Sequence, residues 1–104
     1  MKLKELKFTN PDWEETTFYY YIEKAPVINE ADFVTEVEKK LNRTIDVSKF
    51  NYSKAEISEE EAETFLDKND EVLKLKTLQT DWNISETIIE INNHFIYRIW
   101  ETSA

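Results

Sequence analysis

ISETIIEINNHFIYRIW, residues 84–100, is the stretch of sequence that decides the fold. Two runs rich in β-branched and aromatic residues flank Asn92-Asn93, and such runs are typical of β-strands. Because asparagine tolerates positive φ better than most residues, the pair predicts the two-residue turn of a hairpin. Alternation along both strands predicts one core face and one mixed face. The predicted core face comprises Ile89, Ile91, Phe95, Tyr97 and Ile99, and the mixed face comprises Glu86, Glu90, Arg98 and Trp100.

Further strand and helix patterns occupy most of the chain that precedes this hairpin. An apolar stripe of helical period predicts a helix from Asn29 to Asn42. Ser58 followed by Glu61 is a capping-box pattern, which predicts a second helix through Asp67. Alternating or β-rich runs predict strands at Leu3–Phe8, Thr16–Glu23, Lys49–Lys54 and Glu71–Thr80.

The order of these elements predicts the fold class. Runs of strands separated by helices, without strict alternation, favour an α+β fold. We therefore expect an antiparallel sheet of five or six strands, ending in a three-strand meander, with two helices packed on one face. The length of 104 residues fits a single domain spanning residues 1–104.

Two residue types are missing, and their absence excludes several classes of site. Without cysteine the chain has no disulfide, thiolate zinc site or cysteine nucleophile. Without glycine it lacks the usual phosphate-binding loops and the strained nucleophile elbow. No apolar run is long enough to span a membrane, and the first residues alternate charged with apolar side chains instead of forming a signal sequence. We therefore expect a cytoplasmic protein.

Acidic residues concentrate in one segment. Residues 56–71 contain eight acids and one base, and account for −7 of the formal net charge of −9. A basic patch, which DNA or RNA binding needs in order to replace phosphate counterions, is missing. We therefore expect no direct contact with nucleic acid.

Candidate catalytic and metal-binding groups are few. His94 follows the predicted turn, where it is either a general base or a surface residue at a hairpin tip. The pairs Glu86 with Glu90 and Glu59 with Glu63 share faces of a strand and a helix, but a small chain without glycine loops offers little room for a catalytic cleft. Residues 67–78 lack the glycine and the final glutamate of a calcium loop. We expect no enzymatic activity, no metal and no cofactor.

A binding surface is the better functional hypothesis. Clustered carboxylates can imitate phosphates and steer a basic partner, although the same cluster can also serve only solubility. Aromatic residues exceed what one small core buries, and exposed Trp, Tyr and Arg are typical of binding hot spots. The predicted partner-binding residues are Glu59, Glu60, Glu63, Asp67, Asp70, Trp82, Arg98 and Trp100.

These features predict an inhibitor or immunity-type protein that occludes a basic-surfaced toxin or nuclease. The bias toward Lys, Asn, Ile and Glu is typical of AT-rich bacterial or phage genomes. One alternative is a self-associating structural or regulatory module, such as a homodimer, that pairs through an exposed edge at 16–23 or 94–100. Another is a phage-type anti-defence protein that mimics the charge of nucleic acid.

Overall fold

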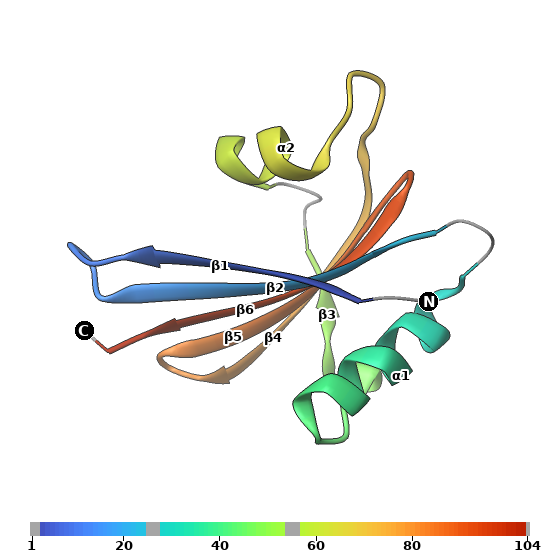
Figure 1. The fold of residues 1–104 in the computed structure, drawn as a ribbon. Coiled ribbons are helices and arrows are strands. Elements are labelled where there is room, and N and C mark those ends of the chain that lie inside the picture. The colour runs from blue at the N-terminus through green and yellow to red at the C-terminus, as the bar shows by residue number, and fades with distance from the viewer. Residues whose placement is uncertain (1–2, 25–27, 54–56, 104) are drawn as a thin grey trace.

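A computed structural model describes residues 3–24, 28–53 and 57–103. Within them, six strands form one antiparallel sheet in the order β1-β2-β6-β5-β4-β3 (Figure 1). The strands are β1 (Lys4–Asn10), β2 (Glu15–Glu23), β3 (Asn51–Tyr52), β4 (Val72–Asp81), β5 (Ile84–Ile91) and β6 (His94–Thr102). The helices are α1 (Glu30–Leu41) and α2 (Glu59–Phe65), and a short 3-10 turn spans Val47–Lys49. The predicted α+β class, the order of elements and the final meander are confirmed.

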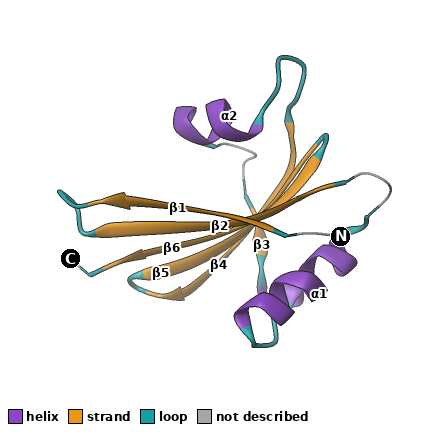
Figure 2. Cartoon of the chain, in the orientation of Figure 1, coloured by secondary structure: helices purple, strands orange, loops and turns teal. Residues whose placement is uncertain are grey.

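The two helices lie on opposite faces of the sheet, so the prediction that they share one face is wrong (Figures 1 and 2). Phe33 of α1 stacks on Phe95 of β6, with ring centroids 5.4 Å apart. Phe65 of α2 contacts Tyr19 and Tyr21 of β2, at 5.4 and 5.1 Å. Tyr21 pairs with Ile96, the residue after Phe95, and successive residues of a strand point to opposite faces. Each helix therefore covers its own apolar layer.

The central hairpin β5–β6 supplies core side chains to both layers. Its two-residue turn sets the register Ile88↔Tyr97 and Ile89↔Ile96, so odd-numbered residues of β5 share a face with even-numbered residues of β6. Ile89 consequently packs in the α2 layer, whereas Tyr97 and Ile88 pack in the α1 layer. The predicted single core face was wrong because it ignored this change of parity across the turn. Both faces of the hairpin therefore bury side chains in a core cluster.

Helix α1 begins and ends at the predicted asparagines. The side-chain oxygen of Asn29 accepts a hydrogen bond from the backbone N–H of Asp32 at 2.8 Å, which satisfies a donor that the first turn leaves free. Asn42 ends the helix in the left-handed conformation, with φ of 55°. Without glycine, asparagine is the least costly residue for this position.

The capping box of α2 is present, because Ser58 and Glu61 exchange hydrogen bonds with each other's backbone N–H. The helix is shorter than predicted and ends at Phe65. The strand predicted over Lys49–Lys54 contracts to Asn51–Tyr52, because the 3-10 turn takes its first residue. Lys54 lies outside the described residues.

The turn at Asn92-Asn93 forms as predicted, but for a different reason. Among the described residues, positive φ without glycine occurs at Glu14 and Asn42, and not at this pair. The side chains of the pair instead bind the loop that precedes β4. Asn92 Oδ1 accepts from the backbone N–H of Glu71 at 2.6 Å, and Asn93 Nδ2 donates to Asp70 Oδ1 at 3.0 Å. The asparagines therefore hold two loops together.

The edges of the sheet are β1 and β3. Strands β2 and β6 pair with each other and have neighbours on both sides, so the prediction that one of them forms an exposed edge is wrong. β1 carries Lys4, Glu5 and Lys7 as exposed side chains, so pairing at this edge favours a strand of complementary charge over an uncharged one.

Candidate functional site

A groove separates α2 from the half of the sheet face that the helix leaves uncovered. Its volume is about 720 Å³, within the range of ligand pockets. Strands β1, β2, β5 and β6 and helix α2 all contribute to its lining. We call it the α2 groove and define it by six of its lining residues: Phe8, Glu15, Tyr19, Glu60, Arg98 and Trp100.

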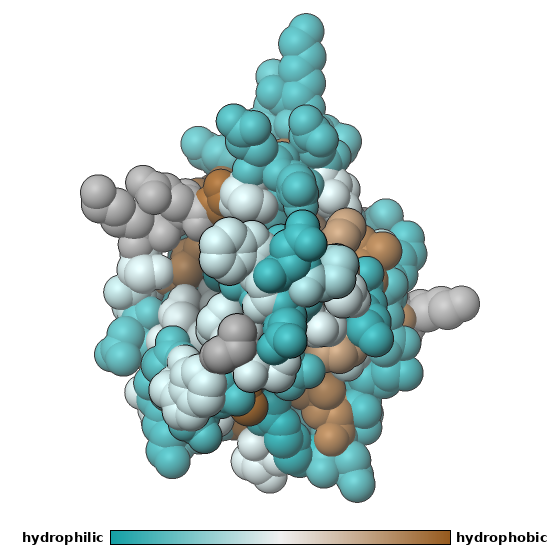
Figure 3. All heavy atoms as spheres, turned by 90° about the vertical axis from the view of Figure 1, so that its left-hand side faces the viewer, coloured by the Kyte–Doolittle hydropathy of each residue, from teal (hydrophilic) through white to brown (hydrophobic). Residues whose placement is uncertain are grey.

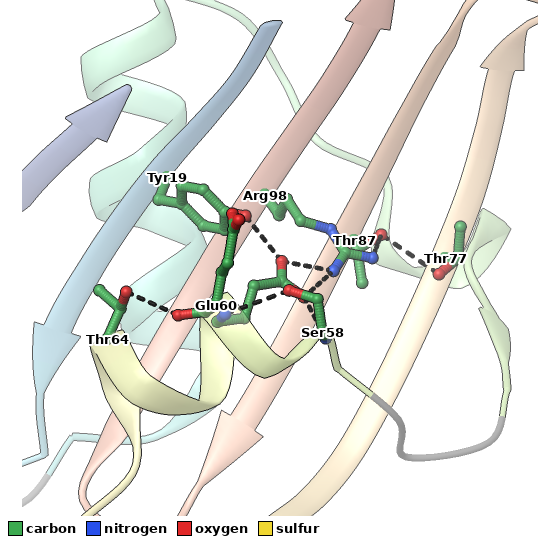
Figure 4. Close-up of polar contacts among 8 residues, drawn as sticks. Tyr19, Ser58, Glu60, Thr64, Thr77, Thr87 and Arg98 are labelled. Carbon is green, nitrogen blue, oxygen red and sulfur yellow. Dashed lines mark hydrogen bonds and ion pairs between the residues drawn. The ribbon is translucent and has the colours of Figure 1, made fainter. Parts of the chain in front are cut away.

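A buried ion pair attaches α2 to the sheet beside this groove. Arg98 Nη1 lies 2.7 Å and 2.9 Å from the two carboxylate oxygens of Glu61. Tyr19 donates its hydroxyl to the same carboxylate at 2.7 Å, and the backbone N–H of Ser58 donates at 2.9 Å. Figure 4 shows Tyr19 and Arg98 reaching from their strands toward the helix, while Arg98 also contacts Thr87. We call Glu61, Tyr19 and Arg98 the α2 anchor.

The electrostatics of the α2 anchor keep Glu61 ionised and Tyr19 protonated. Burial alone raises the pKa of the Glu61 carboxyl, but the hydrogen bond from Ser58 and the contacts with Arg98 outweigh burial and lower it. Burial raises the pKa of the Tyr19 hydroxyl, and the hydrogen bond to Glu61 raises it further. The charge of Glu60 also raises the Tyr19 pKa, which places Glu60 near the anchor. Tyr19 therefore acts as a hydrogen-bond donor to Glu61.

The five predicted acidic residues do not form one surface. Glu59, Glu60 and Glu63 are exposed on α2, as predicted, and Glu60 lines the α2 groove. Asp67 and Asp70 lie beyond the helix in the loop beside the β5–β6 turn, where Asp70 accepts hydrogen bonds from the backbone of Asp67 and from Asn93. Glu56, which begins the acidic segment, lies outside the described residues.

The other three predicted partner-binding residues, Arg98, Trp100 and Trp82, occupy different environments. Arg98 lines the groove, but its charge is already committed to Glu61. Trp100 also lines the groove and is half-buried. Trp82 lies in the β4–β5 turn with 70% of its surface exposed, next to the β1–β2 turn that presents Trp13. Thr102 links these turns, because it bonds both the backbone and the side-chain amide of Asn83 and donates its hydroxyl to the Trp13 carbonyl.

Figure 3 shows the end of the molecule where these two turns lie. Side chains of intermediate hydropathy, drawn nearly white, are scattered there among hydrophilic ones. The view contains no large continuous hydrophobic patch. Trp13 and Trp82 are both exposed, at 67% and 70%, and neither lines the α2 groove.

The α1 side of the sheet differs from the α2 side in its charge balance. Many of the charged groups on the α1 side form ion pairs with each other. These pairs are Lys24–Glu90, Lys40–Glu5, Arg43–Glu86 and Lys76–Glu30. On the α2 side Glu61 is paired, whereas Glu59, Glu60 and Glu63 have no ion pair with any described residue. Unpaired carboxylates therefore gather on the exposed side of α2, whereas several of those on the α1 side face a cation.

A second buried carboxylate, Glu86 on the α1 side, is held like Glu61 by an arginine and a tyrosine hydroxyl. Glu86 is 3% exposed and accepts hydrogen bonds from Arg43, the Tyr97 hydroxyl and Thr80. Burial raises the pKa of Glu86, but the hydrogen bond from Arg43 and those from the two hydroxyls outweigh it and lower the pKa. Glu86 and Glu90 do share a strand face, yet each is bound to its own cation. Each of them is therefore part of a structural ion pair on the α1 side.

His94 is not at an exposed tip, because only 20% of its side chain is accessible. Its Nε2 lies 4.0 Å from a carboxylate oxygen of Glu23, and its buried Nδ1 has no hydrogen-bond partner among the described residues. It does not line the α2 groove. In the part of the chain that the structure describes, no three acidic or histidine side chains are grouped so that they could hold a metal ion.

Residues of the groove that the sequence did not single out for binding include Glu61 and Phe8. The capping box predicted only the local bond of Glu61 with Ser58, and nothing in the sequence places Arg98 beside it, 37 residues away. Comparison with family models, curated proteins and solved structures found no match. Among the described residues, no helix has both the length and the apolar character needed to cross a membrane.

Proposed function

We propose that this chain is a non-enzymatic, cytoplasmic binding protein of the inhibitor or immunity type, which covers the site of a basic-surfaced toxin or nuclease. One observation carries the proposal: the exposed carboxylates of α2, Glu59, Glu60 and Glu63, have no ion pair with any described residue, whereas several carboxylates on the α1 side are paired. Charges that the chain does not neutralise are free to attract a basic surface. Such complementarity mainly raises the association rate and favours the correct partner.

The proposal is tested by reversing two α2 charges and comparing a matched control. Glu59→Lys with Glu63→Lys changes one first-turn and one later acid of α2. Asp12→Lys with Asp32→Lys changes the net charge equally, and Asp32 also lies in the first turn of its helix. Proteins from the source cell that bind the wild type and the control, but not the α2 variant, are then isolated for kinetics.

At low ionic strength we expect the α2 variant to associate with the isolated partner about tenfold or more slowly than wild type. The difference shrinks in about 0.5 M salt, where screening is strong. A partner that is a nuclease or another nucleic-acid enzyme identifies the carboxylates as substitutes for phosphate. If the α2 variant and the control retain every partner with equal rates, the acidic helix serves solubility and the proposal is wrong.

Self-association is a second candidate function, and the edge strand β1 favours it. Phe8 on this strand is 43% exposed. Antiparallel pairing of two β1 strands about Leu6 would place Glu5 opposite Lys7 of the other copy, twice. Light scattering at micromolar concentration tests this arrangement: a dimer that Lys7→Glu disrupts supports it, and a monomeric wild type rules it out.

A further inference from the structure

The α2 groove carries a net negative charge that its own residues do not balance. Four of its lining residues are charged: Glu15, Glu60, Glu61 and Arg98. Arg98 and Glu61 neutralise each other through the contacts described above. Glu15 and Glu60 make no ion pair with any described residue. A concave site with walls of low dielectric concentrates the field of such charges, which attracts a cation.

Aromatic side chains line the same groove and favour a particular kind of cation. Trp100 projects from β6 and Phe8 from β1, and both line the groove. The negative face of an aromatic ring attracts a cation, and tryptophan does so most strongly. A guanidinium group is planar and weakly hydrated, so it stacks on such rings more readily than an ammonium group does.

Hydroxyl groups complete the lining with further acceptors. Thr9, Thr17, Thr64, Ser58 and Ser85 border the groove. Guanidinium presents five N–H donors, which two carboxylates and several hydroxyls can satisfy together. The volume of about 720 Å³ admits an arginine side chain with the adjoining peptide groups.

We infer that the α2 groove binds an arginine side chain of the basic partner, an inference that rests on the function proposed above. The guanidinium lies against Trp100 and pairs with Glu60 and Glu15. Arg98 does not repel it strongly, because Glu61 compensates the Arg98 charge. The buried α2 anchor also fixes the helix that carries Glu60, so the site is formed before the arginine arrives.

The test uses two small probes of nearly the same shape. N-acetyl-arginine amide carries the guanidinium charge, and N-acetyl-citrulline amide replaces it with a neutral urea. Each is titrated into the full chain while amide and indole resonances are followed by NMR. We expect saturable shifts at Trp100, Thr17 and neighbouring groove residues with the arginine probe, and at least tenfold weaker binding of the citrulline probe.

Variants of the groove make the test specific. Glu60→Gln is expected to weaken the arginine probe about tenfold, because it removes a charged hydrogen-bond acceptor, and Glu15→Gln acts in the same direction. Trp100→Leu is expected to weaken it about threefold by removing the cation–π contact. Glu63→Gln and Trp82→Leu are the matched controls outside the groove, and they leave binding unchanged.

Equal binding of the two probes, or shifts that map away from the groove, would overturn the inference. So would unchanged binding by Glu60→Gln, Glu15→Gln and Trp100→Leu. The proposed function can still be tested separately, because the Glu59→Lys, Glu63→Lys variant changes residues that do not line the groove. If that variant still slows association with the partner while the probes fail, the chain binds a basic surface without an arginine pocket.

Discussion

Replacing Arg98 with methionine is the sharpest test of how α2 is held on the sheet. The change keeps most of the volume of the side chain but removes the cation that faces Glu61. The Glu61 side chain is 8% exposed and that of Arg98 is 22% exposed, so water cannot replace the lost partner. Breaking a buried ion pair by removing one member costs about 3–5 kcal/mol. A domain of this size has a free energy of unfolding of about 5–15 kcal/mol, so the loss is a large fraction of the total.

The pH dependence follows from the direction of the Glu61 pKa. In the wild type this pKa is lowered, so the stabilisation is complete above the unfolded-state pKa and is lost only as the pH falls through the lower folded value. Without Arg98, burial raises the Glu61 pKa instead. The folded variant then accepts a proton more readily than the unfolded chain. Its deficit relative to wild type therefore shrinks as the pH falls from 7 toward about 4.5.

Urea denaturation, monitored by circular dichroism at pH 7 and pH 4.5, measures both quantities. The double variant Arg98→Met, Glu61→Gln serves as the control, because its neutral side chain leaves no uncompensated charge. We expect it to recover part of the loss seen at pH 7. If Arg98→Met lowers the free energy of unfolding by less than about 1 kcal/mol at pH 7, the Glu61–Arg98 pair contributes no more than a surface ion pair, which would refute the reasoning. So would a deficit that is equal at the two pH values.

Three further substitutions test other parts of the fold by urea denaturation. Glu14 adopts φ of 50° without being glycine, so Glu14→Gly is expected to stabilise the protein by about 1 kcal/mol; a loss of stability would contradict this. Tyr97→Phe removes a buried donor to Glu86 and should cost about 1–3 kcal/mol, whereas no change would show that Arg43 and Thr80 suffice. Asn92→Ala and Asn92→Gly should destabilise alike, by about 1 kcal/mol, because the side chain binds Glu71 and positive φ is not needed; rescue by glycine would argue for strain.

Features that depend on interactions between residues close in sequence could be predicted from the sequence. The caps of α1 depend on Asn29 and Asn42, and each acts on a backbone group no more than four residues away. The Ser58–Glu61 box spans three residues. The alternation of residues 84–100 predicted a hairpin because side chains of a strand alternate whatever lies on either face. What alternation leaves open is which face is buried.

The candidate site was predicted only in part, for a related reason. Glu60, Arg98 and Trp100 were named from their residue types, and all three line the α2 groove. Their meeting depends on α2 crossing the face that carries Tyr19, and no local pattern encodes that placement. Arg98 differs most from its prediction as a partner-binding residue, because Glu61 of α2 already neutralises its charge. Trp82, of the same residue type as Trp100, remains outside the groove.

The sequence by itself determined most of the secondary structure, the α+β class, the exclusion of sites that need glycine or cysteine, and the acidic segment 56–71 that includes α2. These depend on residue type, local hydrogen bonds and periodicity. Only the tertiary structure decided that the helices cover opposite faces, that β1 is an edge, and that Glu61 meets Arg98 under α2. The physical reason is that the parity of the hairpin 84–100 and the burial of both its faces emerge only when strands pair and helices pack. That hairpin thus supplies core to two layers, and through Arg98 and Trp100 it also forms part of the groove.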